Sequence, residues 1–275
     1  MNGIGWAIII LLLLFIVSLL LFIIYSVLFQ ARWLMWIINK INPKALFYFP
    51  IKTKIIALTV DDAPSNQTEE FLDLFKRYGI HVTFFIIGER VKGREEKMKR
   101  IIEEGHEIGN HTYYDEPSFK NTKEEFEDKL RRTDEVMKPY SLNQRYKWFR
   151  PGSGIPSSFM YDCLEKYGYK LVIGSCHAFD AQIKNCSYTS FILKHGICSG
   201  DIVIVHDREY TLPEVESFLE YCKDKKIQIM SLGEMCDFMN GLQNEEINST
   251  LHKPILPYSI PTPESHSQSI NEYLH

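Results

Sequence analysis

The chain has 275 residues, of which 45% are hydrophobic and 24% charged, a composition that excludes disordered and collagen-like proteins and suffices for a buried core. The formal net charge is −4, and no basic stripe occurs in the soluble part, which argues against a nucleic-acid partner. Neither the number of domains nor the oligomeric state follows from these values.

The N-terminal segment, residues 1–30, is predicted to anchor the chain in a membrane. From Ala7 to Phe29 it carries no charge, and a helix of that length, at about 1.5 Å per residue, crosses a hydrocarbon layer about 30 Å thick. It has neither the basic start nor the small-residue cleavage site of a signal peptide, so we expect an uncleaved single-pass helix in contact with membrane lipid. Trp33 and Trp36 suit the aromatic belt at the membrane surface.

Two signals disagree about the side of the membrane on which the rest of the chain lies. Basic residues follow the apolar segment and none precedes it, which favours the cytoplasm by the positive-inside rule. Four Asn-x-Ser/Thr sequons favour the opposite side if they carry glycans. These sequons begin at Asn66, Asn110, Asn185 and Asn248. The side therefore stays open.

The six cysteines contain no CxxC pair, which argues against a cysteine zinc site. Their even number leaves disulfides and ordinary buried thiols equally open. They are Cys163, Cys176, Cys186, Cys198, Cys222 and Cys236.

Beyond a juxtamembrane linker, residues 31–45, we predict one catalytic domain over 46–240 and a disordered tail over 241–275, where Asn, Ser, Pro and Glu dominate. In the domain, short apolar runs alternate with segments of helical spacing, the pattern of a parallel sheet covered by helices. We predict an α/β fold, a distorted (β/α) barrel of seven or eight parallel strands, with an open doubly wound sheet as the alternative. The runs are Ile55–Val60, Val82–Ile87, Glu107–Thr112, Lys147–Arg150, Leu171–Gly174, Asp201–His206 and Gln228–Leu232.

Chemically active side chains follow five of these runs at the point where each strand is expected to end. Because the carboxyl ends of parallel strands meet at one edge of the sheet, we expect these side chains to converge. A single member has an ordinary explanation, such as a turn with a helix cap or a hydrogen-bonded core histidine, but five sets at one edge indicate a site. The sets are Asp61-Asp62, His111 with Asp115, Arg150, His177 with Asp180, and His206-Asp207.

These residue types are those of a hydrolytic metal site. His111 and Asp115 are four residues apart and, with one carboxylate of Asp61-Asp62, provide three nitrogen and oxygen ligands that leave a position for water. Adjacent strand residues point in opposite directions, so the second aspartate is free to act as the base towards that water. His206 is a candidate acid for the leaving group.

The strand-end residues form five motifs: Thr59–Ser65 (TVDDAPS), His111–Asp115 (HTYYD), Arg150–Gly154 (RPGSG), Asp180, and Ile204–His206 (IVH). In this order they resemble the motifs of the polysaccharide deacetylases, the NodB-homology enzymes that remove acetyl groups from chitin, peptidoglycan and related polymers. The resemblance covers residues 54–240 and implies an N-acetylated glycan as the substrate.

The resemblance also implies a role for each matching residue. Asp61 is the catalytic base, Arg150 orients it, His206 is the catalytic acid and Asp180 supports that histidine. The backbone N–H of Ser153 helps to bind the oxyanion, and Ile204 lines the acetyl pocket. The metal ligands are Asp62, His111 and Asp115.

The chain departs from the family pattern at several of these positions. Asp115 stands where the family usually has a histidine, which makes the loaded site less positive by one charge. We expect a divalent ion, zinc first, with harder ions such as cobalt or manganese tolerated better than usual. Ala63 replaces a glycine, and Gly152 and Ser153 replace bulkier residues, from which we expect a wider groove or a changed sugar preference. A tryptophan common beside the fourth-motif aspartate is absent.

Three functions are therefore considered. The first is deacetylation of an N-acetylated glycan. The second is hydrolysis of an amide or formamide in a small molecule or a lipid-linked sugar, since a fold does not fix its substrate. The third is a catalytically silent glycan-binding relative, which has no need for an intact base, acid and arginine together.

Overall fold

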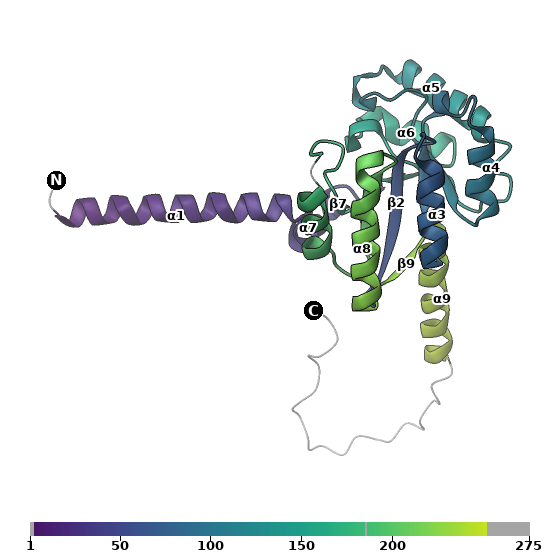
Figure 1. Ribbon diagram of the computed structural model, residues 1–275. Coiled ribbons are helices and arrows are strands. Elements are labelled where there is room, and N and C mark those ends of the chain that lie inside the picture. The colour runs from purple at the N-terminus through teal and green to yellow at the C-terminus, as the bar shows by residue number, and fades with distance from the viewer. Residues whose placement is uncertain (1–2, 185, 252–275) are drawn as a thin grey trace, which may run out of the picture. The chain divides into compact units, whose positions relative to one another are not determined.

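The computed structural model describes residues 3–184 and 186–251, which fall into two compact units, 1–237 and 238–275. The first unit contains a parallel α/β domain, as predicted (Figure 1). In the second unit, the described residues continue the helix α9 (Leu232–Leu251). The helix thus runs past residue 240, where the domain was expected to end, while residues 252–275 of the expected tail lie outside the described part.

Within the described residues, one sheet contains nine strands, and every ladder between them is parallel. Its order is β1-β6-β5-β4-β3-β2-β8-β7, and β9 also pairs with β2. The strands are β1 (Ala45–Leu46), β2 (Ile55–Ala63), β3 (Thr83–Ile86), β4 (Glu107–Asn110), β5 (Trp148–Phe149), β6 (Lys170–Val172), β7 (Cys176–His177), β8 (Ile202–His206) and β9 (Gln228–Met230).

The predicted distorted barrel of parallel strands is confirmed, but the sheet has two edge strands that were not predicted. All seven predicted strands form, but β1 and β7 were not expected, because two residues are too short to show any periodicity. These two strands end the order on either side, and among the described strands no ladder joins them. The sheet therefore curls without closing.

The longest strand, β2, lies at the centre of the sheet, and all its residues are buried. It pairs with β8 along one side and with β3 and β9 along the other. Because both of its faces are covered, its sequence is a continuous apolar run that ends in two aspartates. The buried strand therefore fixes the position of the two aspartates at the carboxyl edge of the sheet.

Helices cover the outer face of the sheet. α3 and α8 lie side by side over β2 (Figure 1), and Phe71, Phe75 and Phe218 from these helices are fully buried in the main core. The α-helices of the domain are α3 (Thr68–Tyr78), α4 (Glu95–Glu103), α5 (Lys123–Met137), α6 (Ser158–Lys166), α7 (Cys186–Gly196) and α8 (Leu212–Lys225). Short 3₁₀ helices are η1 (Gly88–Arg90), η2 (Ser118–Lys120), η3 (Gly152–Gly154) and η4 (Glu209–Thr211).

The apolar N-terminal segment forms one helix, α1 (Gly3–Leu28). Residues 4–28 have a mean hydropathy of 3.6 and are long enough to cross a membrane, a property that spans and signal sequences share. Within the expected linker, residues 31–45, the chain forms the amphipathic helix α2 (Arg32–Ile41), which buries Met35. The side chain of Arg32 pairs with Asp201 at 3.1 Å.

The described cysteines are unpaired thiols. Cys163, Cys176 and Cys222 are buried, and Cys198 and Cys236 are more accessible. For these five residues the structure favours free thiols over the disulfide alternative, with Cys198 exposed and the other four buried or partly buried.

Candidate active site

The carboxyl end of β2 carries Asp61 and Asp62, each only 4% exposed. The register of β2 with β8 puts Asp61 opposite His206. Asp62 has a φ of 68°, in the left-handed region that residues other than glycine rarely adopt. Thr112 and Ser153, which follow other strands at this edge, also have left-handed φ values. Strained residues of this kind cluster at functional sites.

Eight of the nine predicted site residues line one pocket of about 580 Å³ at this edge of the sheet. The ninth, Asp180, is fully buried behind His206. The expected convergence of the strand ends is therefore observed. The eight lining residues are Asp61, Asp62, His111, Asp115, Arg150, Ser153, Ile204 and His206.

Asp61 is paired with a fully buried arginine. Nη1 of Arg150 donates to Oδ1 of Asp61 at 2.6 Å and to the hydroxyl of Thr59 at 2.8 Å, while its Nε donates to the backbone of Val172 at 3.3 Å. The guanidinium also lies over the ring of Phe85, 4.1 Å from its centroid. Burial lowers the pKa of Arg150 from its usual value, and Asp61 opposes that shift. Because Arg150 is held on several sides, it fixes Oδ1 of Asp61 in one position. Oδ2 of Asp61 takes no part in this bond.

His206 is held by Asp180. Oδ1 of Asp180 lies 2.8 Å from Nδ1 of His206, and its Oδ2 accepts from the backbone N–H of His206 and the hydroxyl of Thr211, both at 2.8 Å. Burial lowers the pKa of His206, but the hydrogen bond and negative charge of Asp180 outweigh it and raise that pKa to about 8. With Nδ1 engaged, Nε2 is the nitrogen available to donate a proton.

His111 and Asp62 form a donor pair suited to a divalent ion. Nδ1 of His111 lies 2.8 Å from the carbonyl oxygen of Arg150 and donates to it, so Nε2 carries the free lone pair. That Nε2 is 3.7 Å from Oδ1 of Asp62. Two ligands of one tetrahedral zinc ion are about 3.4 Å apart, so this pair fits such an ion with little adjustment. Burial raises the pKa of Asp62, but electrostatic interactions with His111, His206 and Arg208 and the hydrogen bond from Arg208 hold it below its usual value.

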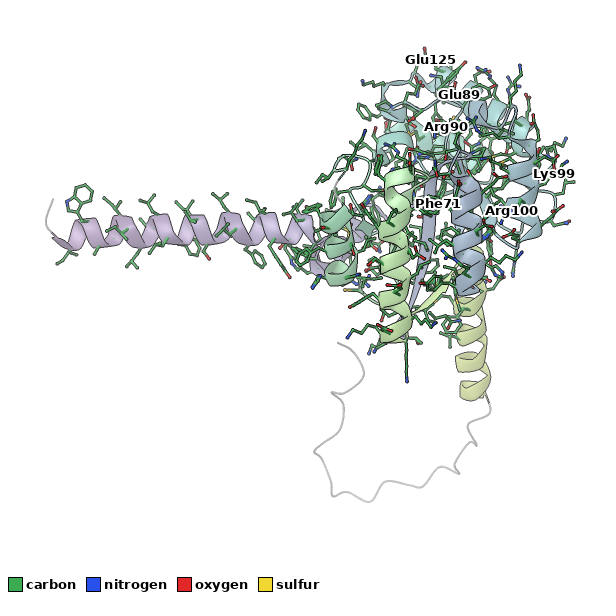
Figure 2. All side chains as sticks on the ribbon, viewed as in Figure 1. Phe71, Glu89, Arg90, Lys99, Arg100 and Glu125 are labelled. Carbon is green, nitrogen blue, oxygen red and sulfur yellow. The ribbon has the colours of Figure 1, made fainter. Side chains whose placement is uncertain are left out.

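Asp115 lines the pocket but does not join this pair. Its Oδ2 accepts from Nη2 of Arg90 at 2.6 Å, and Nη1 of the same arginine donates to the backbone oxygen of Asp62. Figure 2 shows Arg90 beside Glu89 near the upper end of β2. Among residues 3–184 and 186–251, no three His, Cys, Asp or Glu side chains come close enough to hold a metal ion. The ligand role of Asp115 therefore stays a prediction.

Arg208 is a pocket residue that the sequence analysis missed. Its Nη2 donates to Oδ2 of Asp62 at 2.6 Å, and its Nη1 donates to the hydroxyl of Tyr210 at 3.0 Å. It stands two residues after His206, directly behind a strand end. Applying the strand-end rule beyond Asp207 would have included it.

Ser153 and Ile204 both line the pocket. Gly152 precedes Ser153, and a Cβ at Gly152 would collide with the backbone oxygen of Glu116, so only glycine fits there. Ile204 is 3% exposed, and its side chain packs against the backbone at Gly174, where a Cβ would meet it. Neither residue has a partner that fixes its role, and both assignments stay predictions.

An aspartate fixed by a buried arginine, an aspartate-supported histidine and a carboxylate–imidazole pair around one pocket define a site of the hydrolase class. Comparison with known proteins narrows this class. The family model described as polysaccharide deacetylase matches residues 50–172. The peptidoglycan-N-acetylglucosamine deacetylase of Bacillus cereus is 30% identical over 194 residues, covering 68% of this chain and 90% of that protein. The chain belongs to the polysaccharide deacetylase family.

Solved structures agree on the fold. The CE4 family pseudoenzyme BA3943 of Bacillus anthracis superposes with a TM-score of 0.64 at 22% identity, covering 70% of this chain and 69% of that one. The peptidoglycan deacetylase PdaC of Bacillus subtilis gives the same TM-score at 21% identity, covering 71% and 96%. At these identities the likeness concerns the fold alone.

Proposed function

We propose that this protein is a divalent-metal-dependent deacetylase that hydrolyses the N-acetyl groups of a glycan. The observation that carries the proposal is the pairing of Asp61 with Arg150 and of His206 with Asp180 around one pocket. The peptidoglycan deacetylase names of the relatives support an N-acetylated sugar polymer or glycoconjugate as the substrate. The proposed catalytic domain covers residues 46–240.

Asp61 is proposed to act as the base. Its oxygen that is not bound to Arg150 accepts a proton from the attacking water as the water oxygen bonds to the amide carbon. Arg150 pairs with Asp61 and limits its rotation, so the base is held ready in one orientation.

His206 is proposed to act as the acid. The proton on Nε2 passes to the amide nitrogen as the C–N bond breaks, which releases the free amine of the sugar and acetate. Asp180 stabilises the imidazolium that must be present before this transfer. The N–H of Ser153 is proposed to bind the carbonyl oxygen as it gains negative charge, and Ile204 to contact the acetyl methyl group.

The proposed ligands of the ion are Asp62, His111 and Asp115. A divalent ion bound there would polarise the amide carbonyl and make the water more acidic. Zinc is the first candidate ion, and the oxygen-rich donor set makes harder ions such as cobalt or manganese better suited than usual.

The test is acetate release from N-acetylglucosamine oligomers and from peptidoglycan fragments, with zinc, cobalt or manganese supplied in turn. We expect release with at least one ion and none after chelation. Release of formate or hydrolysis of small amides without acetate from either glycan would instead favour the alternative amidase or deformylase function.

Binding without catalysis is a second candidate, because arginines engage both Asp62 and Asp115. A silent relative would bind the oligomers with unchanged affinity after chelation and release no acetate at any metal concentration. The intact pairs of Asp61 and His206 favour catalysis over this candidate.

Asp115→Ala is expected to weaken divalent-ion affinity and activity together, by at least about tenfold in affinity, since one of three ligands is lost. Isothermal titration with zinc measures the affinity. Asp115→His should keep the ion and shift the rising limb of the pH–rate profile to lower pH, because a neutral ligand replaces a carboxylate and the site loses one negative charge.

The matched control for Asp115 is Glu116→Ala, which removes the neighbouring carboxylate of the pocket lining. That carboxylate pairs with Lys129 and is not a proposed ligand. Unchanged affinity in Asp115→Ala would remove Asp115 from the ligand set.

We also propose that α1 anchors the protein in a membrane as a single retained span. Its apolar composition supports this, and so does α2, whose Trp33 and Trp36 are 46% and 52% exposed beside Lys40. Gln30, directly after α1, exchanges two hydrogen bonds with the backbone of His177 in the edge strand β7, so the domain holds the end of the anchor.

N-terminal sequencing of the protein purified from membranes is expected to find α1 still attached. Cleavage near Gln30 would also remove the two hydrogen bonds between Gln30 and His177 or expose them to solvent. A mature N-terminus near Gln30 would contradict the anchor.

A further inference from the structure

The two carboxylates proposed to bind the ion, Asp62 and Asp115, are each engaged by an arginine. Arg208 binds Asp62 and Arg90 binds Asp115, both at 2.6 Å. The other charged groups at the centre of the pocket balance one another, Asp61 with Arg150 and Asp180 with His206. The two arginines therefore supply the two positive charges that a divalent ion would otherwise bring.

Placing the divalent ion and both guanidinium groups on these carboxylates at the same time is energetically unfavourable. With the ion and both guanidinium groups in place, the ligand region would carry an excess of two positive charges around the buried carboxylate of Asp62. One guanidinium must therefore move away, or the ion must bind more weakly than its donors alone allow.

The two arginines differ in how firmly they are held. Arg90 is also bonded to the backbone oxygen of Asp62, which stays in place whatever its side chain binds. The guanidinium of Arg208 instead donates to two side chains, the carboxylate of Asp62 and the hydroxyl of Tyr210, and the side chain of Arg208 is 32% exposed. A guanidinium on a flexible stem at the pocket mouth can turn towards solvent at small cost.

We propose that Arg208 is an internal competitor of the metal ion: its guanidinium occupies Asp62 in the metal-free protein and must be displaced when the ion binds. The proposal rests on the proposed ligand role of Asp62. It predicts that the site fills only at a higher free metal concentration than the same donors would need without Arg208.

The test compares zinc affinities of the full-length protein and of Arg208→Gln by isothermal titration. Removing the competing charge is expected to tighten binding by at least about tenfold, equivalent to about 1.4 kcal/mol. Arg208→Lys keeps the charge and should bind zinc nearly as the wild type does. Tyr210→Phe removes one anchor of the guanidinium and should tighten binding by a smaller factor.

The control for net charge is Arg77→Gln, which makes the same change of one charge at a surface pair with Glu216, in the last turn of α3 and outside the pocket lining. It is expected to leave zinc affinity unchanged. A tightening as large as that of Arg208→Gln would assign the effect to overall charge and overturn the proposal.

A second readout follows Arg208 itself. Modification of the wild type by phenylglyoxal, mapped by mass spectrometry, should label Arg208 faster with zinc than without, because the ion releases the guanidinium. Equal labelling in both states would contradict displacement.

The outcomes separate this proposal from the proposed function. Tighter binding by Arg208→Gln without acetate release from the wild type supports the competitor role and contradicts the deacetylase. Acetate release by the wild type together with equal or weaker zinc binding by Arg208→Gln supports the deacetylase and contradicts the competitor role. Absence of zinc binding in both proteins overturns the competitor role and the ligand set together.

Discussion

Asp61→Asn is expected to abolish acetate release and to leave the metal content of the protein nearly unchanged. The amide keeps the shape of the side chain and an oxygen that can accept from Arg150, but it has no basic oxygen to take the proton of the water. Because Asp61 is assigned as the base and Asp62 as the ligand, the ion should remain bound. Acetate assays and elemental analysis of the same preparations measure the two effects.

A matched control for Asp61 is Asp207→Asn, on the neighbouring strand end. Asp207 is also buried, but its Oδ2 accepts from the backbone N–H of Ser65 at 3.0 Å and serves the turn before α3. An asparagine oxygen can keep that bond, so most of the activity should survive. If Asp61→Asn loses the metal instead, the roles of Asp61 and Asp62 are exchanged.

His206→Ala is expected to reduce turnover by at least about a hundredfold, the usual contribution of a positioned general acid. The imidazole must carry a proton to donate it, so activity should fall as pH rises through its pKa, which is about 8 in the metal-free protein. This falling limb should be absent from the residual activity of the variant. Steady-state rates across the pH range measure both effects.

The control for His206 is His177→Ala, since both histidines line the pocket. Burial and the charge of Arg150 lower the pKa of His177 to about 4, so it is neutral at working pH and is a poor proton donor. Its loss should cost much less than the loss of His206. NMR titration of the metal-free protein should find His206 near pH 8, and Asp180→Asn should lower that value. Equal losses from the two alanine variants would contradict the assignment of the acid.

The sequence by itself determined the parallel α/β fold and most of the pocket. A strand covered on both faces must be apolar throughout, so β2 was visible as a continuous run that stops at Asp61. Parallel strands also end at one edge, which is why residues as distant as Asp61 and His206 could be expected together before any distance was known.

Only the tertiary structure decided which cation each carboxylate meets. Arg90 and Arg208 lie 28 and 146 residues from Asp62, and both reach it through long side chains whose direction leaves no periodic trace in the sequence. The same holds for α2, whose packing against the domain depends on a surface that exists only after folding. Periodicity reports whether a residue is buried, whereas the choice of partner depends on distances that the folded chain alone sets.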